Sequence, residues 1–149
     1  GYEEALESLG FRPGLVEAAS LALLSAAETG PGDRVLVNWD EGYVSFVLTR
    51  AGQPLLLRTL PGDVGRDSVV RHATGTMQCH RGRLGGQALA GVVLRSAVGP
   101  GDEAAALLER AFAAPVRLIR PWAALGITEE GASAQAVAGA AACVLRRAA

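Results

Sequence analysis

Asp40 and Glu41 are the adjacent side chains in this sequence whose type and position suit ligand chemistry. They follow Trp39 and lie between two apolar segments, in an expected tight turn. A carboxylate pair in such a turn can hold a cation or a polar ligand. An ordinary solvated hairpin turn is the alternative interpretation. Three further acidic pairs lie at expected helix starts or in loops, where solvated carboxylates are typical: Glu3 with Glu4, Asp102 with Glu103, and Glu129 with Glu130.

Histidine and cysteine do not form a pattern typical of a metal or nucleophile site. His72 and His80 are eight residues apart on a predicted helix and fall on roughly the same side, whereas Cys79 points elsewhere. Two histidines and one cysteine do not match a zinc-ligand spacing. We therefore predict no metal site and expect both histidines on a helix surface. No G-x-S-x-G elbow occurs either, so we predict no catalytic residue.

The glycine-rich segments are poor candidates for a phosphate site. Residues 82–86 precede an expected strand, whereas an anion site needs the N-terminus of a helix. Gly99 and Gly101 do follow a strand and precede a helix. However, Pro100 lacks an N–H group, and Asp102 places negative charge where a phosphate would bind. All 14 basic residues are arginine, so the usual phosphate-loop lysine is also absent.

The composition indicates one globular domain. The chain has 149 residues, of which 50% are hydrophobic and 19% are charged, so a disordered polar segment is excluded. The formal net charge of -1 argues against nucleic acid and against an anionic membrane surface as partners. Two cysteines do not make a disulfide framework, and no apolar run approaches the roughly 18 residues that span a bilayer. We expect an intracellular, cytoplasmic chain with no direct membrane insertion.

Hydrophobic periodicity predicts an order of elements that changes character after Pro61. Up to that point the pattern indicates two helices and then three strands joined by short turns, which is typical of an antiparallel meander. Beyond Pro61, helices and strands alternate. The predicted helices cover residues 2–9, 18–28, 102–113 and 133–147, with another that starts at Asp67 or Ser68; the predicted strands cover residues 35–38, 43–49, 55–60, 90–94 and 116–119.

The fold class that follows is α/β, with a five-stranded mixed sheet and helices on both faces. We expect the first three strands to be antiparallel and the two later strands to run parallel to the first. Close packing of helices on a sheet explains the abundance of alanine and glycine. No linker or internal repeat divides the chain.

Three segments resemble the second half of an actin-like ATPase: residues 35–48 with residues 52–58, residues 91–99, and residues 134–143. The resemblance is to PilM-type pilus assembly proteins and their secretion-system relatives. It covers most of the chain, including residues 2–13, and rests on the order and pattern of elements. It implies a helical lead-in over residues 1–33 and an RNase H-like subdomain over residues 34–149.

The residues at the family's nucleotide site depart from its pattern. Without a gap, Asn38, Trp39 and Asp40 replace the D-x-G turn, which removes its acidic residue and its glycine. A shift of two residues makes Asp40, Glu41 and Gly42 a literal D-x-G, but the first strand then becomes unusually long. Ser96 and Ala97 stand where the family has its adenosine-contacting Gly-Gly. The degenerate nucleotide-site candidates are Asn38, Asp40, Glu41, Gly42, Ser96, Ala97 and Gly99.

The resemblance implies a role in a bacterial type IV pilus or secretion assembly. The family's first phosphate loop belongs to an N-terminal half that is absent from this sequence, so the chain is either a subdomain of a longer protein or a form that lost this half. We expect a non-catalytic scaffold without a cofactor. Its partner would be a protein, namely a cytoplasmic segment of an inner-membrane component. An ATP- and magnesium-binding half-domain that needs its missing half is the alternative, and an unrelated small enzyme with a carboxylate turn is a third.

Overall fold

The computed structural model describes residues 2–10, 18–27, 30–62, 64–128 and 132–148, so Glu129 and Glu130 of the predicted acidic pairs, like residues 11–13, lie outside the described residues. Within these ranges, five strands form one sheet in the order β3-β2-β1-β4-β5. The strands are β1 (Asp33–Asp40), β2 (Tyr43–Arg50), β3 (Gln53–Pro61), β4 (Leu89–Ser96) and β5 (Val116–Leu118). β1, β2 and β3 form the antiparallel meander, β4 runs parallel to β1, and β5 runs parallel to β4. The predicted mixed sheet is confirmed.

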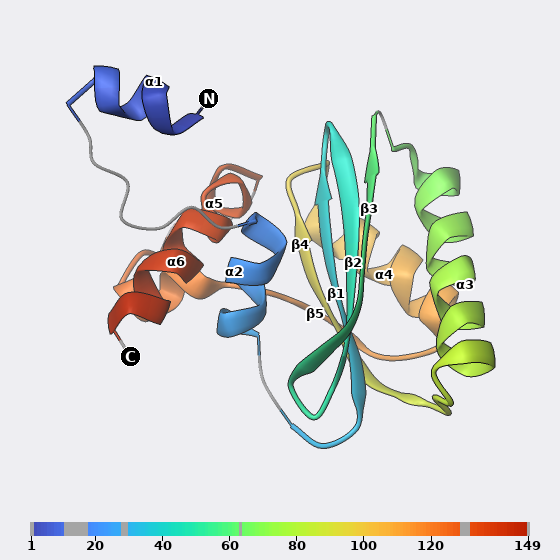
Figure 1. The fold of residues 1–149 in the computed structure, drawn as a ribbon. Coiled ribbons are helices and arrows are strands. Elements are labelled where there is room, and N and C mark those ends of the chain that lie inside the picture. Colours follow the sequence, from blue (N-terminus) through green and yellow to red (C-terminus); the bar gives the residue numbers. More distant parts are fainter. Residues whose placement is uncertain (1, 11–17, 28–29, 63, 129–131, 149) are drawn as a thin grey trace.

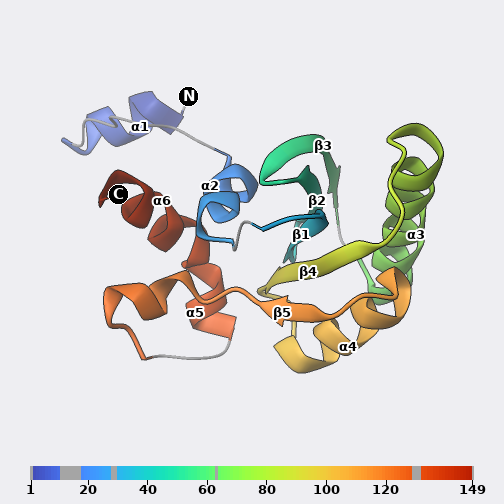
Figure 2. The same cartoon turned by 90° about the horizontal axis from the view of Figure 1, so that it is seen from below.

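Helices cover both faces of this sheet. They are α1 (Tyr2–Ser8), α2 (Ala19–Ala26), α3 (Arg66–Arg83), α4 (Gly101–Phe112), α5 (Ala132–Ala136) and α6 (Ala138–Ala148), with a 3₁₀ helix at Pro121–Leu125. Figures 1 and 2 show α2, α5 and α6 on one face, α3 and α4 on the other, and α1 set apart from the sheet. No helix among the described residues is both long and apolar enough to cross a membrane.

Two helix predictions need correction. Helix α3 is preceded by Gly65 at its N-cap, without a side-chain cap, so neither Asp67 nor Ser68 caps it; Asp67 lies inside the first turn, where its charge suits the helix dipole. The predicted final helix over residues 133–147 is two helices, α5 and α6. The break between the two helices lies at the end of α5. There the Arg95 guanidinium donates hydrogen bonds to the carbonyl oxygens of Gln135 and Ala136.

Side-chain alternation along β1 builds two hydrophobic cores. Val35 and Val37 pack with residues of α3 and α4, whereas Leu36 packs with residues of α2, α5 and α6. Trp39 belongs to the first core and is 2% exposed, and its indole N–H donates to the Val64 carbonyl at 3.1 Å. The tryptophan next to the carboxylate pair is therefore a core residue. The same alternation sends Asn38 and Asp40 to the opposite face, toward α2 and α5.

Candidate functional site

The carboxyl ends of β1 and β4 form the candidate site. In open α/β sheets, ligands bind outside the carboxyl ends of parallel strands. β1 and β4 are adjacent and parallel, with Trp39 paired to Ser96, so their ends meet at one edge of the sheet. All seven sequence-predicted positions lie at this edge: Asn38 and Asp40 in β1, Glu41 and Gly42 in the turn to β2, Ser96 at the end of β4, and Ala97 and Gly99 in the connection to α4.

The turn after β1 is formed by Glu41 and Gly42. β1 runs for eight residues to Asp40, which pairs with Tyr43 across the hairpin. The predicted strand end at Asn38 is therefore wrong, and the length of this strand is no obstacle to a shifted D-x-G match. The reason is the partner strand: β2 is also eight residues long and pairs with β1 over its whole length.

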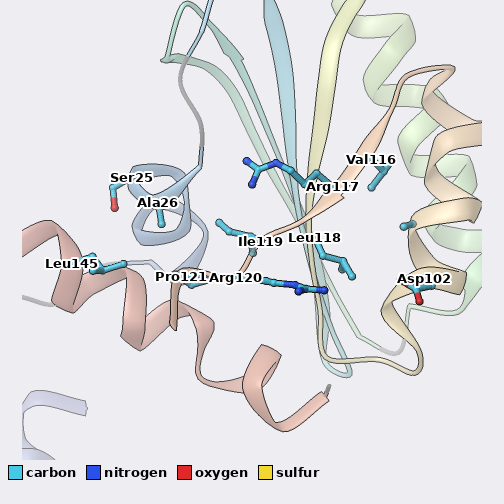
Figure 3. A pocket seen from close by; sticks show the side chains of 11 residues that line it. Ser25, Ala26, Asp102, Val116, Arg117, Leu118, Ile119, Arg120, Pro121 and Leu145 are labelled. Atoms are coloured by element: carbon cyan, nitrogen blue, oxygen red, sulfur yellow. The ribbon is translucent and has the colours of Figure 1, made fainter. Parts of the chain in front are cut away.

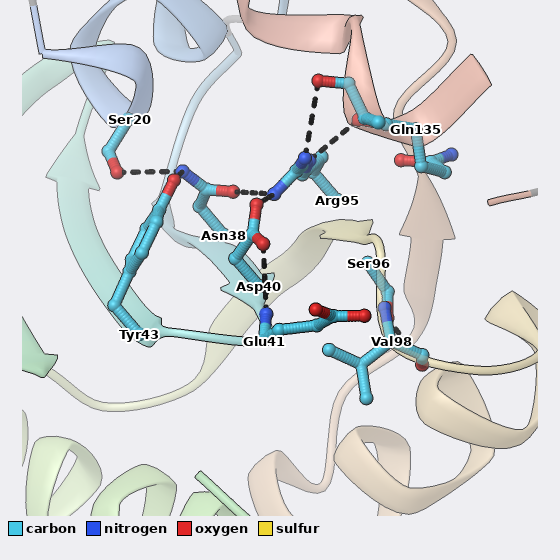
Figure 4. A network of polar contacts seen from close by, with 10 residues as sticks. Ser20, Asn38, Asp40, Glu41, Tyr43, Arg95, Ser96, Val98 and Gln135 are labelled. Carbon is cyan, nitrogen blue, oxygen red and sulfur yellow. Dashed lines mark hydrogen bonds and ion pairs between the residues drawn. The ribbon is translucent and has the colours of Figure 1, made fainter. Parts of the chain in front are cut away.

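Arg95 is the central side chain of the site. It projects from β4 between the sheet and α5 and is 5% exposed (Figure 4). Its guanidinium donates to the Asp40 carboxylate, to the side-chain oxygen of Asn38 at 3.1 Å and to the Gln135 carbonyl at 2.7 Å. A buried charge is costly unless it is paired and hydrogen-bonded, and this arginine has both kinds of partner.

The amide of Asn38 is also fully engaged (Figure 4). Its oxygen accepts from Arg95, and its Nδ2 group donates to the Ser20 hydroxyl at 3.0 Å and to the Tyr43 hydroxyl at 3.1 Å. The side chain is 1% exposed. In the gapless match to the resembled family, Asn38 stands at the acidic position. Here it links β1, β2, β4 and α2, and its oxygen already accepts from the Arg95 guanidinium.

Asp40 is an ionised carboxylate held within the chain. Burial raises its pKa, but the hydrogen bond from Arg95 and the backbone N–H of Glu41, at 2.9 Å, outweigh that effect. The net result is a pKa below the ordinary value of 3.8, so the Asp40–Arg95 ion pair is intact at neutral pH.

Two backbone N–H groups of the connection from β4 to α4 are hydrogen-bonded within the chain. The Ala97 N–H donates to the Trp39 carbonyl at 3.0 Å, and the Val98 N–H donates to the Ser96 hydroxyl at 3.3 Å. Pro100 is the N-cap of α4, and Asp102 and Glu103 occupy its first turn. A phosphate needs several backbone N–H groups that converge on it without nearby carboxylates, and this connection does not provide them.

A small cavity lies beside the ion pair on the α2 and α6 side of the sheet. Its volume is about 280 Å³. Asn38, Asp40, Tyr43 and Arg95 form its polar wall, and small or apolar residues of α2, α5 and α6 complete the lining.

No family model and no curated protein matches this sequence. Solved structures do match by fold. The structure titled "PilM-PilN type IV pilus biogenesis complex" has a TM-score of 0.68 and 18% sequence identity, over 95% of this chain and 54% of that chain. A Bacteroides thetaiotaomicron protein described as having an actin-like ATPase fold and unknown function has a TM-score of 0.58 and 12% identity, over 80% of this chain and 46% of that chain.

This chain has the actin-like ATPase fold. The resemblance to that superfamily, with PilM among the matching structures, is confirmed at the level of the fold. The chain spans about half the length of these two structures, 54% and 46%. The RNase H-like class that the resemblance implied is likewise confirmed.

A second polar cluster of this actin-like chain lies at the opposite end of β1. The Asp33 carboxylate accepts two hydrogen bonds from Arg50, both at 2.8 Å, and lies 2.6 Å from Nε2 of His80. The hydrogen bonds from Arg50 are the largest influence on Asp33 and, together with His80, hold its pKa well below the ordinary value despite burial. Gly86 packs so closely that an added Cβ would lie 1.8 Å from the His80 ring. This cluster joins β1, β2 and α3.

The prediction that both histidines lie on a helix surface is wrong for His80. That side chain is 0% exposed, because it falls on the same stripe of α3 as Val69, Ala73 and Met77. His72 is half-buried, and its Nδ1 lies 3.2 Å from the Arg58 guanidinium. Burial, Arg58 and the nearby Arg71 all lower the His72 pKa. Among the described residues, no group of three or more histidine, cysteine, aspartate or glutamate side chains is arranged to hold a metal ion.

Sequence reasoning missed Arg95, Asp33 and Arg50 as functional or structural polar residues. The available signal for Arg95 was an isolated charge directly after three apolar residues of a strand, because a charge in a buried strand needs a partner. For Asp33 and Arg50 no comparable signal exists, because their pairing follows from the register of β1 with β2.

Proposed function

We propose that this chain is a non-catalytic, actin-like scaffold subdomain of a type IV pilus or secretion assembly, and that it binds a partner protein. In this proposal residues 1–33 are a helical lead-in and residues 34–149 an RNase H-like subdomain. The observation that carries the proposal is the ion pair between the buried Arg95 and the partly exposed Asp40, which occupies the edge of the sheet where a ligand would be expected.

Each requirement for a bound nucleotide is met poorly at this edge. Asp40 is paired with Arg95, and the Asn38 oxygen already accepts from the same guanidinium. The N–H groups of Ala97 and Val98 are used within the chain. A triphosphate would also meet the charge of Asp40, since the lowered pKa keeps this group ionised. The residues present therefore do not fit a magnesium–nucleotide group.

The nature of the partner is proposed from the matching structure. Its title describes PilM together with PilN in a type IV pilus biogenesis complex, which is a complex of two proteins. By analogy, we propose a cytoplasmic segment of an inner-membrane pilus or secretion component as the partner. The chain would then act in the bacterial cytoplasm, at the inner membrane through that partner.

A second candidate function is the ATP-binding half of an actin-like ATPase that requires another half. The observation that favours it is the position of Asp40, Glu41 and Gly42, which form the strand end and turn that a D-x-G match needs. In that case Asp40 would have to leave Arg95 in order to face a magnesium ion.

The proposal is tested by measuring the affinity of the full-length gene product for cytoplasmic segments of the inner-membrane components encoded with it, with and without Mg-ATP. A scaffold binds one of them with the same affinity in both conditions. Binding that depends on Mg-ATP, or binding of none of these segments, would overturn the scaffold proposal.

A further inference from the structure

A large groove in the described part of the chain lies along the open edge of β5. It has a volume of about 910 Å³, near the upper end of the roughly 300–1,000 Å³ typical of ligand sites. Residues of α2 and α6, Ala26 and Leu145 among them, form one wall, and Asp102 of α4 lies on the other (Figure 3). The floor is the sheet edge itself, because β5 is the last strand in the sheet order.

The backbone of β5 presents hydrogen-bonding groups to this groove. On the inner side, the Ile119 N–H donates to the Leu94 carbonyl at 2.8 Å, and the Pro115 carbonyl accepts from Val92 at 2.9 Å. Successive residues of a parallel strand turn their N–H and C=O groups to opposite sides. The N–H and C=O groups of Leu118 therefore point away from β4, toward the groove.

The charges around the groove favour an acidic ligand. Arg117 and Arg120 are both exposed lining residues, and Asp102 is the acidic lining residue across from them. Glu109 of α4 also reaches this edge, where its carboxylate accepts from the Val116 N–H at 3.3 Å and leaves Leu118 as the outward-facing residue of β5 for a partner strand. In Figure 3, Arg117 extends toward α2, and Asp102 lies across the groove on α4. Both arginines also have interactions within the chain, which an incoming carboxylate would join or exchange with. The local positive charge nevertheless attracts carboxylates over several ångströms.

The other open edge, β3, is less suited to a partner strand. Leu55 and Leu57 are exposed there, at 39% and 48%. However, Pro54 and Pro61 lie near its ends, and a register shift opposite Leu48 and Thr49 leaves Leu55 as an extra residue. Prolines and bulges are the devices by which proteins block pairing at an edge. Pro115 and Pro121 flank β5 as well, but no bulge interrupts Val116–Leu118, and helical walls enclose its edge.

We infer that the β5 edge binds an extended, acidic segment of a partner protein by strand addition. This inference rests on the proposed function, namely that the chain binds a partner protein, and it assigns the place and chemistry of that binding. Main-chain hydrogen bonds from the edge of β5 supply affinity, and the groove walls and arginines supply specificity.

A fluorescein-labelled heptapeptide of alternating glutamate and valine is a suitable probe. The unmodified chain should bind it saturably in a fluorescence anisotropy titration. A heptapeptide of alternating arginine and valine should bind at least about tenfold more weakly. The Arg117→Glu/Arg120→Glu double variant should lose at least about tenfold in affinity for the acidic peptide. The matched control is Arg110→Glu, an exposed arginine of α4 outside the groove lining, which should retain it.

Amide hydrogen exchange supplies the structural readout, because Leu118 and Ile119 are neighbours with opposite orientations. Saturating acidic peptide should slow exchange of the Leu118 N–H at least about tenfold, whereas the Ile119 N–H, already bonded to Leu94, should change little. Absence of peptide binding, or binding without protection of Leu118, would overturn the inference. Neither result bears on Mg-ATP dependence, so failure here is distinguishable from failure of the proposed function.

Discussion

The two ends of β1 each carry an aspartate paired with an arginine, but the burial of the two partners is reversed. At the amino end, the Asp33 side chain is 9% exposed and the Arg50 side chain is 45% exposed. At the carboxyl end, the Arg95 side chain is 6% exposed and the Asp40 side chain is 30% exposed. The first pair faces α3 and the second faces α2 and α5. The acid is therefore the buried member at one end, and the base at the other.

This difference indicates different roles. The amino-end cluster is sealed by His80 and by the close approach of Gly86, so it can only join β1 to its neighbours. The carboxyl-end cluster borders a cavity at the edge where such sheets bind ligands. There a buried arginine requires an anion, and the chain supplies its own. Because Arg95 and Asp40 satisfy each other's charge at this edge, we propose that the function of the chain lies on other surfaces.

Loss of the carboxyl-end acid should have the largest effect. Asp40→Ala leaves Arg95 buried without a counter-charge, which should cost about 3–5 kcal/mol in the free energy of unfolding. Chemical denaturation measures this. The Asp40→Ala/Arg95→Met double variant removes the stranded charge and should recover most of the loss. If the double variant is as unstable as Asp40→Ala, the ion pair is not the source of the effect.

Glycine substitutions at the two ends of β1 should differ in their effect on stability, because the amino end is tightly packed and the turn at the carboxyl end is open. Gly86→Ala forces a Cβ against the His80 ring and should destabilise the chain by about 2–3 kcal/mol. Gly42→Ala, in the turn at the other end, meets nothing within 4 Å and should change stability by less than about 1 kcal/mol. Thermal unfolding of the two variants provides the comparison. Equal destabilisation would contradict the assigned difference in packing.

The smallest expected effect is pH-dependent and belongs to Asp33. Its pKa is lowered in the folded chain, so its ionised form stabilises the fold above the unfolded-state value of 3.8, and that stabilisation is lost as the pH falls below it. Asp33→Asn should cost about 1–2 kcal/mol at neutral pH, because Arg50 can turn to solvent. The difference from the unmodified chain should shrink below about pH 4. A difference that stays constant down to about pH 3 would show that Asp33 does not act through its charge.

The sequence predicted the sheet because its periodicities are local. Alternation within residues 43–49 and the strand–helix order after Pro61 determine the meander and the parallel strands. The ends of the strands were harder to predict from the sequence, since β1 extends to Asp40 only because β2 pairs with it. His80 shows the same limit: its spacing from Val69 and Ala73 places it on the apolar stripe, yet its partner Asp33 is 47 residues away in the sequence.

The sequence predicted which residues lie at the candidate site but not the contacts among them. The resemblance marked Asn38, Asp40 and Ser96 as candidates for one nucleotide site, and the structure brings them together at one edge of the sheet. It did not indicate that Arg95 would bind two of them, because that contact depends on the register of β1 with β4 and on the position of α5. Contacts that require three elements to meet are not encoded in any one segment.

Isothermal titration of Mg-ATP into the full-length gene product tests the central claim, that an internal ion pair has replaced a nucleotide site at the carboxyl ends of β1 and β4. No heat of binding is expected at nucleotide concentrations up to about 1 mM, the weak end of ordinary ligand affinities. Micromolar affinity that is lost in the Asp40→Asn variant but kept in Glu41→Gln would contradict it, because Asp40 would then serve the nucleotide instead of Arg95.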